Sequence, residues 1–169
     1  MKEFLKVVLY LAIGLAVFVS ACYIRGMYLP EEHEIERSVT IMAPRAEVWN
    51  AIRDYQSLPQ WYSPVTAVEK LPAENGDACY LEMHKKERVK VCEHVVTQGK
   101  EAVDRIEEEV FQGTWTYDLQ SINATSTHLT TTEHGRIYSP WSRFLAYQFG
   151  LGAGLNSFHA DLKKRVENK

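Results

Sequence analysis

The sequence predicts an α+β fold in which a curved antiparallel sheet grips one long C-terminal helix, preceded by an N-terminal transmembrane helix. Three observations predict this fold. Short runs of alternating apolar and polar residues between 65 and 137 are joined by tight turns, which indicates an antiparallel meander. Apolar residues recur every three or four positions from Trp141 to Val166, which indicates a long amphipathic helix. Residues 7–24 carry no charge.

The uncharged run VVLYLAIGLAVFVSACYI spans residues 7–24. Eighteen helical residues extend roughly 27 Å, close to the ~30 Å hydrocarbon core of a bilayer. Lys2 and Lys6 precede the run and Arg25 follows it, a weak bias that favours a domain on the extracytoplasmic side. We therefore expect residues 1–25 to form a single-pass anchor that meets the membrane through residues 7–24. The alternative is a lipoprotein signal, because the V-S-A-C motif that ends at Cys22 is similar to a bacterial processing box.

The rest of the chain divides into a linker over residues 26–33 and one domain over residues 34–167. The domain starts with a strand over 34–42, and a helix follows from Pro44 to about Asp54. A second short helical turn carries Trp61. Strands are expected over 65–71, 78–84, 88–98, 101–111, 114–122 and 127–137, with Asn75-Gly76 as a hairpin turn. Ser139 caps the final helix, which runs to about residue 166.

Three glycines, Gly150, Gly152 and Gly154, interrupt this last helical pattern. Each glycine costs up to about 1 kcal/mol relative to alanine inside a helix. A kink, a close approach to the sheet or an opening for a ligand would each account for them. The alternative is two helices with a break between them.

Charge and motifs exclude several functions. The net charge is −3 and the predicted pI is about 6.1, without the concentrated positive charge that nucleic acid binding requires. The six histidines show no paired metal spacing, and no H-E-x-x-H or C-x-x-C motif is present. Neither a glycine-rich phosphate loop nor G-x-S-x-G is present. We expect no metal, no cofactor and no nucleic acid partner.

Cys79 and Cys92 flank a predicted hairpin, so its turn decides whether they meet. A two-residue turn at Lys85-Lys86 would set the cysteines opposite each other. A three-residue turn over 85–87 instead pairs Met83 with Val89, which keeps apolar residues on one face. The three-residue turn gives the cleaner pattern, so we expect no disulfide.

One face of the predicted sheet and the apolar face of the final helix together supply a candidate ligand cavity. Apolar walls with a few polar groups are typical of small-molecule sites. Glu133 has the same parity as Leu129 and Thr131, and a carboxylate in an apolar hollow would have a raised pKa. The alternative is that Glu133 is exposed to solvent at the end of the strand or forms an ion pair with Arg105 or Arg136. The candidate ligand-binding residues are Trp61, Tyr80, Trp115, Tyr117, Leu119, Leu129, Thr131, Glu133, Phe144, Gln148, Leu151 and Leu155.

The start of the domain resembles the SRPBCC superfamily. The resemblance rests on E-R-S at 36–38, I-M-A-P at 41–44, V-W at 48–49, D-Y at 54–55 and L-P-Q-W at 58–61. The most similar branch is the polyketide cyclase/dehydrase and lipid-transport group, which is related to START domains and the birch-allergen fold. The resemblance implies a helix-grip fold whose short helix pair plugs one end of the curved sheet. Trp61 would then be a lid residue that either covers the core or faces the cavity mouth.

Three functional hypotheses follow from these patterns and the resemblance. The leading one is a membrane-tethered protein that binds a hydrophobic small molecule or lipid between sheet and helix. The second is a cyclase or dehydratase that uses Glu133 with Tyr117 or Tyr80. The third is an interaction module without a ligand, which predicts a filled interior and an exposed apolar patch.

Overall fold

The structure, a computed structural model, describes residues 1–108 and 111–168. Residues 109–110, which the sequence places in a strand, and residue 169 lie outside the described residues. The helices are α1 (Lys2–Met27), α2 (Arg45–Arg53), η1 (Tyr55–Ser57), α3 (Leu58–Trp61), α4 (Pro140–Phe149) and α5 (Ala153–Glu167). The strands are β1 (Glu32–Ile41), β2 (Val65–Glu74), β3 (Asp77–His84), β4 (Arg88–Thr97), β5 (Glu101–Glu107), β6 (Phe111–Asn123) and β7 (Ser126–Ile137).

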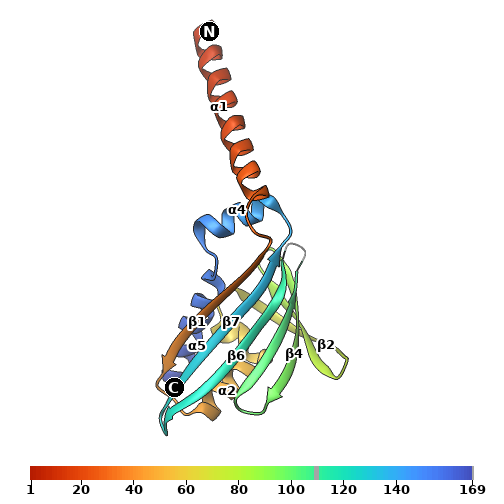
Figure 1. Ribbon diagram of the computed structural model, residues 1–169, viewed down its shortest axis with the longest axis vertical. Coiled ribbons are helices and arrows are strands. Elements are labelled where there is room, and N and C mark those ends of the chain that lie inside the picture. Colours follow the sequence, from red (N-terminus) through yellow and green to blue (C-terminus); the bar gives the residue numbers. More distant parts are fainter. Residues whose placement is uncertain (109–110, 169) are drawn as a thin grey trace.

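The seven strands form one antiparallel sheet in the order β1-β7-β6-β5-β4-β3-β2. β1 and β2 are consecutive strands along the chain, yet they lie at opposite edges of the sheet. The connection through α2, η1 and α3 therefore crosses from one edge to the other, and Figure 1 shows it at the end of the sheet away from α1. The predicted α+β helix-grip fold is confirmed.

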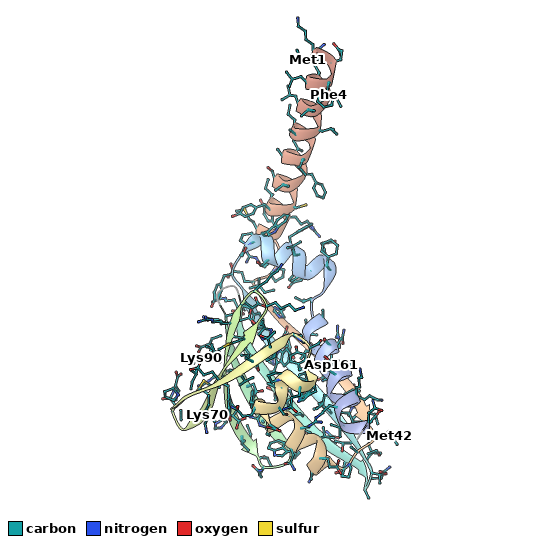
Figure 2. All side chains as sticks on the ribbon, turned by 180° about the vertical axis from the view of Figure 1, so that it is seen from behind. Met1, Phe4, Met42, Lys70, Lys90 and Asp161 are labelled. Atoms are coloured by element: carbon teal, nitrogen blue, oxygen red, sulfur yellow. A yellow bond between two sulfur atoms is a disulfide. The ribbon has the colours of Figure 1, made fainter. Side chains whose placement is uncertain are left out.

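The core lies between the sheet and α5. Leu155, Phe158, Leu162 and Val166 follow the expected helical spacing, and all four are buried. Phe158, Leu162 and Val166 belong to one core cluster with buried residues of α2 and inward residues of β6 and β7. Asp161 on the neighbouring face of α5 accepts hydrogen bonds from the backbone N–H and the hydroxyl of Ser63, which hold α5 to the start of β2 (Figure 2).

Two local predictions about turns and caps hold. Asn75 and Gly76 both adopt positive φ, 54° and 90°, and join β2 to β3. The hydroxyl of Ser139 accepts a hydrogen bond from the backbone N–H of Ser142 at 3.3 Å, with Pro140 as the first residue of α4. Local sequence therefore fixes these boundaries.

The prediction of a single C-terminal helix is wrong, because the helix is interrupted between α4 and α5. Gly152 has φ of +82°, which favours glycine over residues with a side chain. A Cβ at this position would also lie 3.1 Å from Cγ2 of Ile35. The glycine run thus provides a bend and a close approach to β1, and α4 turns away from the axis of α5 (Figure 1).

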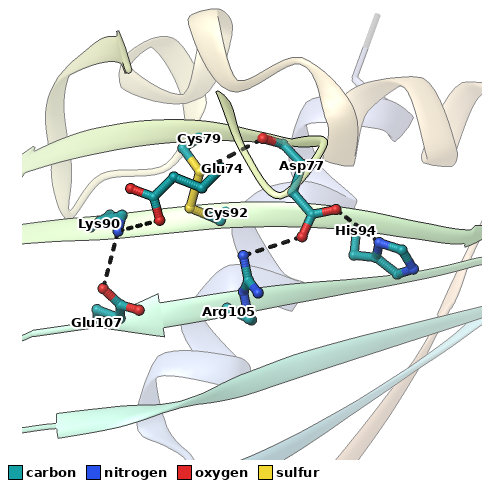
Figure 3. The surroundings of a disulfide bond; sticks show 8 residues. All are labelled: Glu74, Asp77, Cys79, Lys90, Cys92, His94, Arg105 and Glu107. Atoms are coloured by element: carbon teal, nitrogen blue, oxygen red, sulfur yellow. Dashed lines mark hydrogen bonds and ion pairs between the residues drawn. A yellow bond between two sulfur atoms is a disulfide. The ribbon is translucent and has the colours of Figure 1, made fainter. Parts of the chain in front are cut away.

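The predicted register of the β3–β4 hairpin is wrong by one residue. Met83 pairs with Arg88, and Cys79 pairs with Cys92, so the turn contains only Lys85 and Lys86. The two sulfur atoms form a disulfide, contrary to the prediction (Figure 3). The error has a physical cause: the inward face of β3 carries Glu82 and His84 because it lines a cavity rather than a packed core.

A network of charged residues surrounds the disulfide (Figure 3). Lys90 contacts Glu74 at 2.8 Å and Glu107 at 3.3 Å, and so links the β2–β3 hairpin to β5. Asp77 likewise contacts both His94, at 2.8 Å, and Arg105, at 3.2 Å. The two cysteines are buried although they lie on the face of the sheet that carries these charges.

In the described chain, α1 is the one helix long and apolar enough to cross a membrane, a property that signal sequences share. Figures 1 and 2 show it projecting from the domain, with Met1 and Phe4 at its far end. Most of its large apolar side chains are exposed in the isolated chain. Exposed apolar area of this extent is typical of surfaces that contact a membrane or another protein.

Candidate functional site

A cavity of about 300 Å³ lies between the concave face of the sheet and α5. This volume falls at the lower end of the range typical of ligand pockets. Its apolar walls are supplied by Ile52, Leu58, Val89, Val91, Ile106 and Phe158. The cavity is therefore bounded by α2, α3, β4, β5 and α5, the elements that the fold brings around the interior.

A second cavity of about 220 Å³ adjoins the first. The two share Ile106, Glu108, Trp115 and Gly154 in their walls. The second extends toward α4, where Ala146 and the segment 150–152 form part of its wall. Trp115 and Gly154 thus lie between two neighbouring cavities, which together reach from α2 to α4.

Phe158 is the centre of an aromatic cluster in the wall of the first cavity. Its ring centroid lies 5.4 to 5.8 Å from those of Trp61, Tyr62, Trp115 and Tyr117. Tilted and edge-to-face contacts at these distances are favourable beyond the burial of area. The cluster therefore holds α5 against α3 and β6 while leaving space beside it.

A buried network of hydrogen bonds surrounds Asp104 at the first cavity. The Tyr55 hydroxyl donates to Asp104 Oδ2 at 2.6 Å, and Arg53 Nη1 donates to Oδ1 at 3.1 Å. Arg53 also binds Glu93. Burial, followed by the charge of Asp104, raises the pKa of both Tyr55 and Tyr117. These two hydroxyls consequently remain protonated and act as hydrogen-bond donors.

Glu133 lies at the second cavity with both carboxylate oxygens engaged. Oε1 is 2.8 Å from His33 Nε2, and Oε2 accepts a hydrogen bond from Trp115 Nε1 at 2.6 Å. Glu133 therefore points inward as its parity predicts, but its partners come from β1 and β6 rather than from Arg105 or Arg136. This arrangement fixes the indole that separates the two cavities.

Acidic side chains gather in the wall of the first cavity, and one of them, Glu108, also lines the second. Glu82, Glu87 and Glu108 line the first cavity with His84, whose Nε2 is 3.2 Å from Glu82 Oε2. Burial, followed by the charge of Glu87, raises the pKa of Glu108 to about 7. Glu108 thus changes its charge near neutral pH inside the candidate site.

The raised pKa of Glu108 gives a test of this acidic cluster. The folded chain binds the Glu108 proton more tightly than the unfolded chain, so this group's contribution to stability is full below about pH 4.5 and is lost as pH rises through about 7. We expect Glu108→Gln to gain stability relative to wild type on going from about pH 5 to about pH 8. Urea unfolding at both values measures the difference.

The control for this prediction is Glu107→Gln. Glu107 is the neighbouring residue, is exposed, and contacts Lys90. The difference in free energy of unfolding between Glu107→Gln and wild type should not increase with pH. Equal pH dependence in wild type and Glu108→Gln would show that Glu108 is charged throughout this range and that the cluster is more solvated than described.

His159 is a second buried titratable group, behind the cavity wall. Thr131 Oγ1 lies 2.8 Å from its Nε2, and burial lowers the pKa of the imidazole to about 4. His159 is therefore neutral at physiological pH, when the Thr131 hydroxyl can donate to Nε2. Thr131 is occupied by this bond and does not face either cavity.

Four of the twelve residues predicted for the site line a cavity: Trp115, Tyr117, Glu133 and Leu151. The other eight line neither of the two cavities described. Leu119, Leu129 and Leu155 are fully buried core residues, as is Thr131. Tyr80 stacks on Tyr55, Trp61 donates to Ser57 Oγ at 3.3 Å beside Phe158, and Phe144 stacks on Trp141. Gln148 is exposed on α4.

Sequence reasoning missed the acidic and imidazole side chains of the site. Glu82 and His84 were not among the predicted site residues, although Tyr80, which has the same parity on β3, was. His33 was assigned to a linker, although it is the second residue of β1. The spacing of Cys79 and Cys92 was the available signal, because pairing the two cysteines sets Glu82 opposite Val89, an apolar residue of the cavity wall.

Comparisons with known proteins agree with this geometry. The family described as polyketide cyclase/dehydrase and lipid transport matches residues 32–167. No curated protein matches the chain significantly. Many solved structures are similar in fold.

An aromatase/cyclase from a Streptomyces species has a TM-score of 0.72 at 13% identity, covering 81% of this chain and 94% of that one. A START superfamily protein from Mycobacterium smegmatis has a TM-score of 0.68 at 16% identity, covering 80% of this chain and 98% of that one. Norcoclaurine synthase from Thalictrum flavum, in complex with dopamine and hydroxybenzaldehyde, has a TM-score of 0.61 at 12% identity, with coverage of 86% and 91%. At these identities the likeness extends to the fold alone.

Proposed function

Because the chain belongs to the polyketide cyclase/dehydrase and lipid-transport family, we propose that it binds a hydrophobic small molecule or lipid between the sheet and α5, beside a membrane that α1 crosses. The observation that carries the proposal is the apolar cavity of about 300 Å³ with its adjoining chamber. A module without a ligand would have a filled interior, so the cavity favours ligand binding over that alternative.

The charge of the walls narrows the class of ligand. Acidic side chains line both cavities, whereas neither lysine nor arginine contributes to either wall within the described residues. Arg53 lies behind Asp104 and compensates that one carboxylate. Glu82 contacts His84 and Glu133 contacts His33, but carboxylates outnumber histidines in the two walls, so a ligand with a free carboxylate or phosphate would meet net negative charge. The ligand class is therefore neutral, or positively charged at one end.

The length and hydropathy of α1 support the proposed tether, and the disulfide supports an extracytoplasmic domain. Disulfides persist in oxidising compartments and are rare where thiols are kept reduced. The weak positive bias at Lys2 and Lys6 points the same way. Cys22 is buried on the side of α1 that packs on α4, which favours an uncleaved anchor over lipidation at Cys22.

Gly154 gives a sharp test because it lines both cavities. A Cβ there would meet only the ring of Trp115, at 3.6 Å, which is ordinary van der Waals contact. We expect Gly154→Leu to fill the junction and to lower ligand retention at least about tenfold without loss of stability, since glycine costs up to about 1 kcal/mol in a helix. The full chain is stripped of lipid in detergent, incubated with a total lipid extract and re-isolated, and bound molecules are identified by mass spectrometry.

The matched control is Gly154→Ala, which adds one methyl group and should retain the ligand. Lipid that adheres to α1 will be the same in all three proteins, so only the difference between them reports the cavity. Identical bound molecules in wild type and Gly154→Leu would contradict the proposal.

A cyclase-type reaction is the second candidate function. The dyad of Glu133 and His33 lines the second cavity together with Glu108, whose pKa is about 7, which suits proton transfer near neutral pH. The partners first expected for Glu133 lie elsewhere: Tyr80 stacks on Tyr55, and Tyr117 lies near Asp104. Turnover of a β-keto thioester that disappears in Glu108→Gln would favour this candidate over simple binding.

A further inference from the structure

α4 packs directly against the domain end of α1. The buried residues of α1 are Cys22 and Gly26, one helical turn apart. A Cβ at Gly26 would overlap the carbonyl group of Pro140, so the two backbones touch at the first residue of α4. Figures 1 and 2 both show α4 running crosswise at the end of α1. The two helices form one packed corner rather than a domain on a free tether.

This corner lies at the level where the apolar run of α1 ends. Cys22 is inside the uncharged segment 7–24, and Gly26 is two residues beyond it. At 1.5 Å per residue, the contact zone extends only about 3 Å to either side of the end of the run. If α1 spans a bilayer, α4 therefore lies at the boundary between hydrocarbon and headgroups.

The outer face of α4 carries the side chains expected at such a boundary. Trp141, Leu145 and Phe149 follow one another at intervals of four residues and are 38%, 38% and 78% exposed. Tyr138, just before the helix, is 44% exposed. The one charged residue of α4 is Arg143, which is buried with Nη1 at 2.8 Å from Glu31 Oε1. Trp, Phe and Leu are typical of the apolar face of interfacial helices, and Trp and Tyr are enriched at membrane–water interfaces.

We propose that α4 is a membrane-interfacial helix whose outer face, formed by Tyr138, Trp141, Leu145 and Phe149, lies in the headgroup region of the bilayer that α1 spans. The proposal rests on the proposed membrane tether and deepens it. Ala146, on another side of α4, lines the second cavity, as does the segment 150–152 that follows the helix. The cavity then lies about one helix diameter, ~10 Å, from the lipid. A hydrophobic ligand can pass between bilayer and cavity without crossing bulk water.

Tryptophan fluorescence in vesicles tests the proposal. The full chain is reconstituted into phosphatidylcholine vesicles, with or without acyl chains brominated near the carbonyl end. α1 contains no tryptophan, and Trp49, Trp61 and Trp115 pack in the domain, so bromine should quench Trp141 selectively. We expect the emission lost to bromine per chain to fall at least about threefold in Trp141→Phe, and to be unchanged in Trp61→Phe. Phe149→Trp should add a second quenched component.

The outcomes separate this proposal from the function on which it rests. If the chain floats with the vesicles but bromine quenches Trp141→Phe and wild type equally, the tether is supported and the interfacial position of α4 is overturned. Protection from bromine together with crosslinking through α4 would assign its outer face to a second copy of the chain, and would also overturn it. Failure to float would refute the tether itself.

Discussion

Asp104→Ala is expected to destabilise the domain by about 3 kcal/mol, because it removes one of the two carboxylates that pair with Arg53 and the acceptor of the Tyr55 hydroxyl. Asp104 is 3% exposed and receives hydrogen bonds from Arg53 and Tyr55. Its removal leaves the Arg53 guanidinium with Glu93 alone, in a site where Arg53 Nε already lacks a partner. The Tyr55 hydroxyl also loses its acceptor. Urea unfolding of the purified chain measures the loss.

A double-mutant cycle separates the ion pair from general damage to the cavity wall. Asp104→Asn keeps the volume and one acceptor oxygen, so its cost should be smaller than that of Asp104→Ala. The double variant Asp104→Asn, Arg53→Met should lose less free energy of unfolding than the sum of the two single variants, because the partner charge is removed as well. Strict additivity would mean that Arg53 and Asp104 do not interact in solution as the structure describes.

Much of the fold could be predicted because local signals and burial agree over most of the chain. Asn75-Gly76 determines one hairpin, and Ser139 determines the start of α4. The parity of Tyr117 and Leu119 correctly identifies the inward face of β6. At these positions an apolar side chain is also a core side chain, so the pattern and the structure coincide.

The candidate site was harder to predict because polar side chains face inward there. The three-residue turn was preferred because it kept apolar residues on one face, whereas the structure pairs Met83 with Arg88 and places Glu82 and His84 at the cavity. Leu119 and Leu129 were assigned to the cavity, although they fill the core completely. Parity distinguishes the inside of the sheet from the outside, but it does not distinguish core from cavity. Whether an inward residue lines the core or the cavity depends on the position of α5, which is set by the interruption between α4 and α5.

The disulfide leads to the second large effect and to a test of the compartment. Cys79 and Cys92 are 13 residues apart, and closing a loop of this length stabilises a domain by about 3 kcal/mol through the unfolded state. We expect the double change Cys79→Ser, Cys92→Ser to lower the free energy of unfolding by about that amount. The loss should be the same when wild type is unfolded in reductant, and reductant should not affect the double variant.

Cys22→Ser is the matched control, because Cys22 is the remaining cysteine and is not bonded to another. It should unfold like wild type in both conditions. If the domain folds outside the cytoplasm, chain recovered from membranes should unfold at the midpoint of the disulfide-bonded protein. Its two domain cysteines should also resist alkylation until reductant is added. Chain from membranes that is alkylated at Cys79 and Cys92 without reductant would contradict an extracytoplasmic domain. The cavity would then face the cytoplasmic leaflet, because the packing of α1 on α4 places it next to whichever surface the domain occupies.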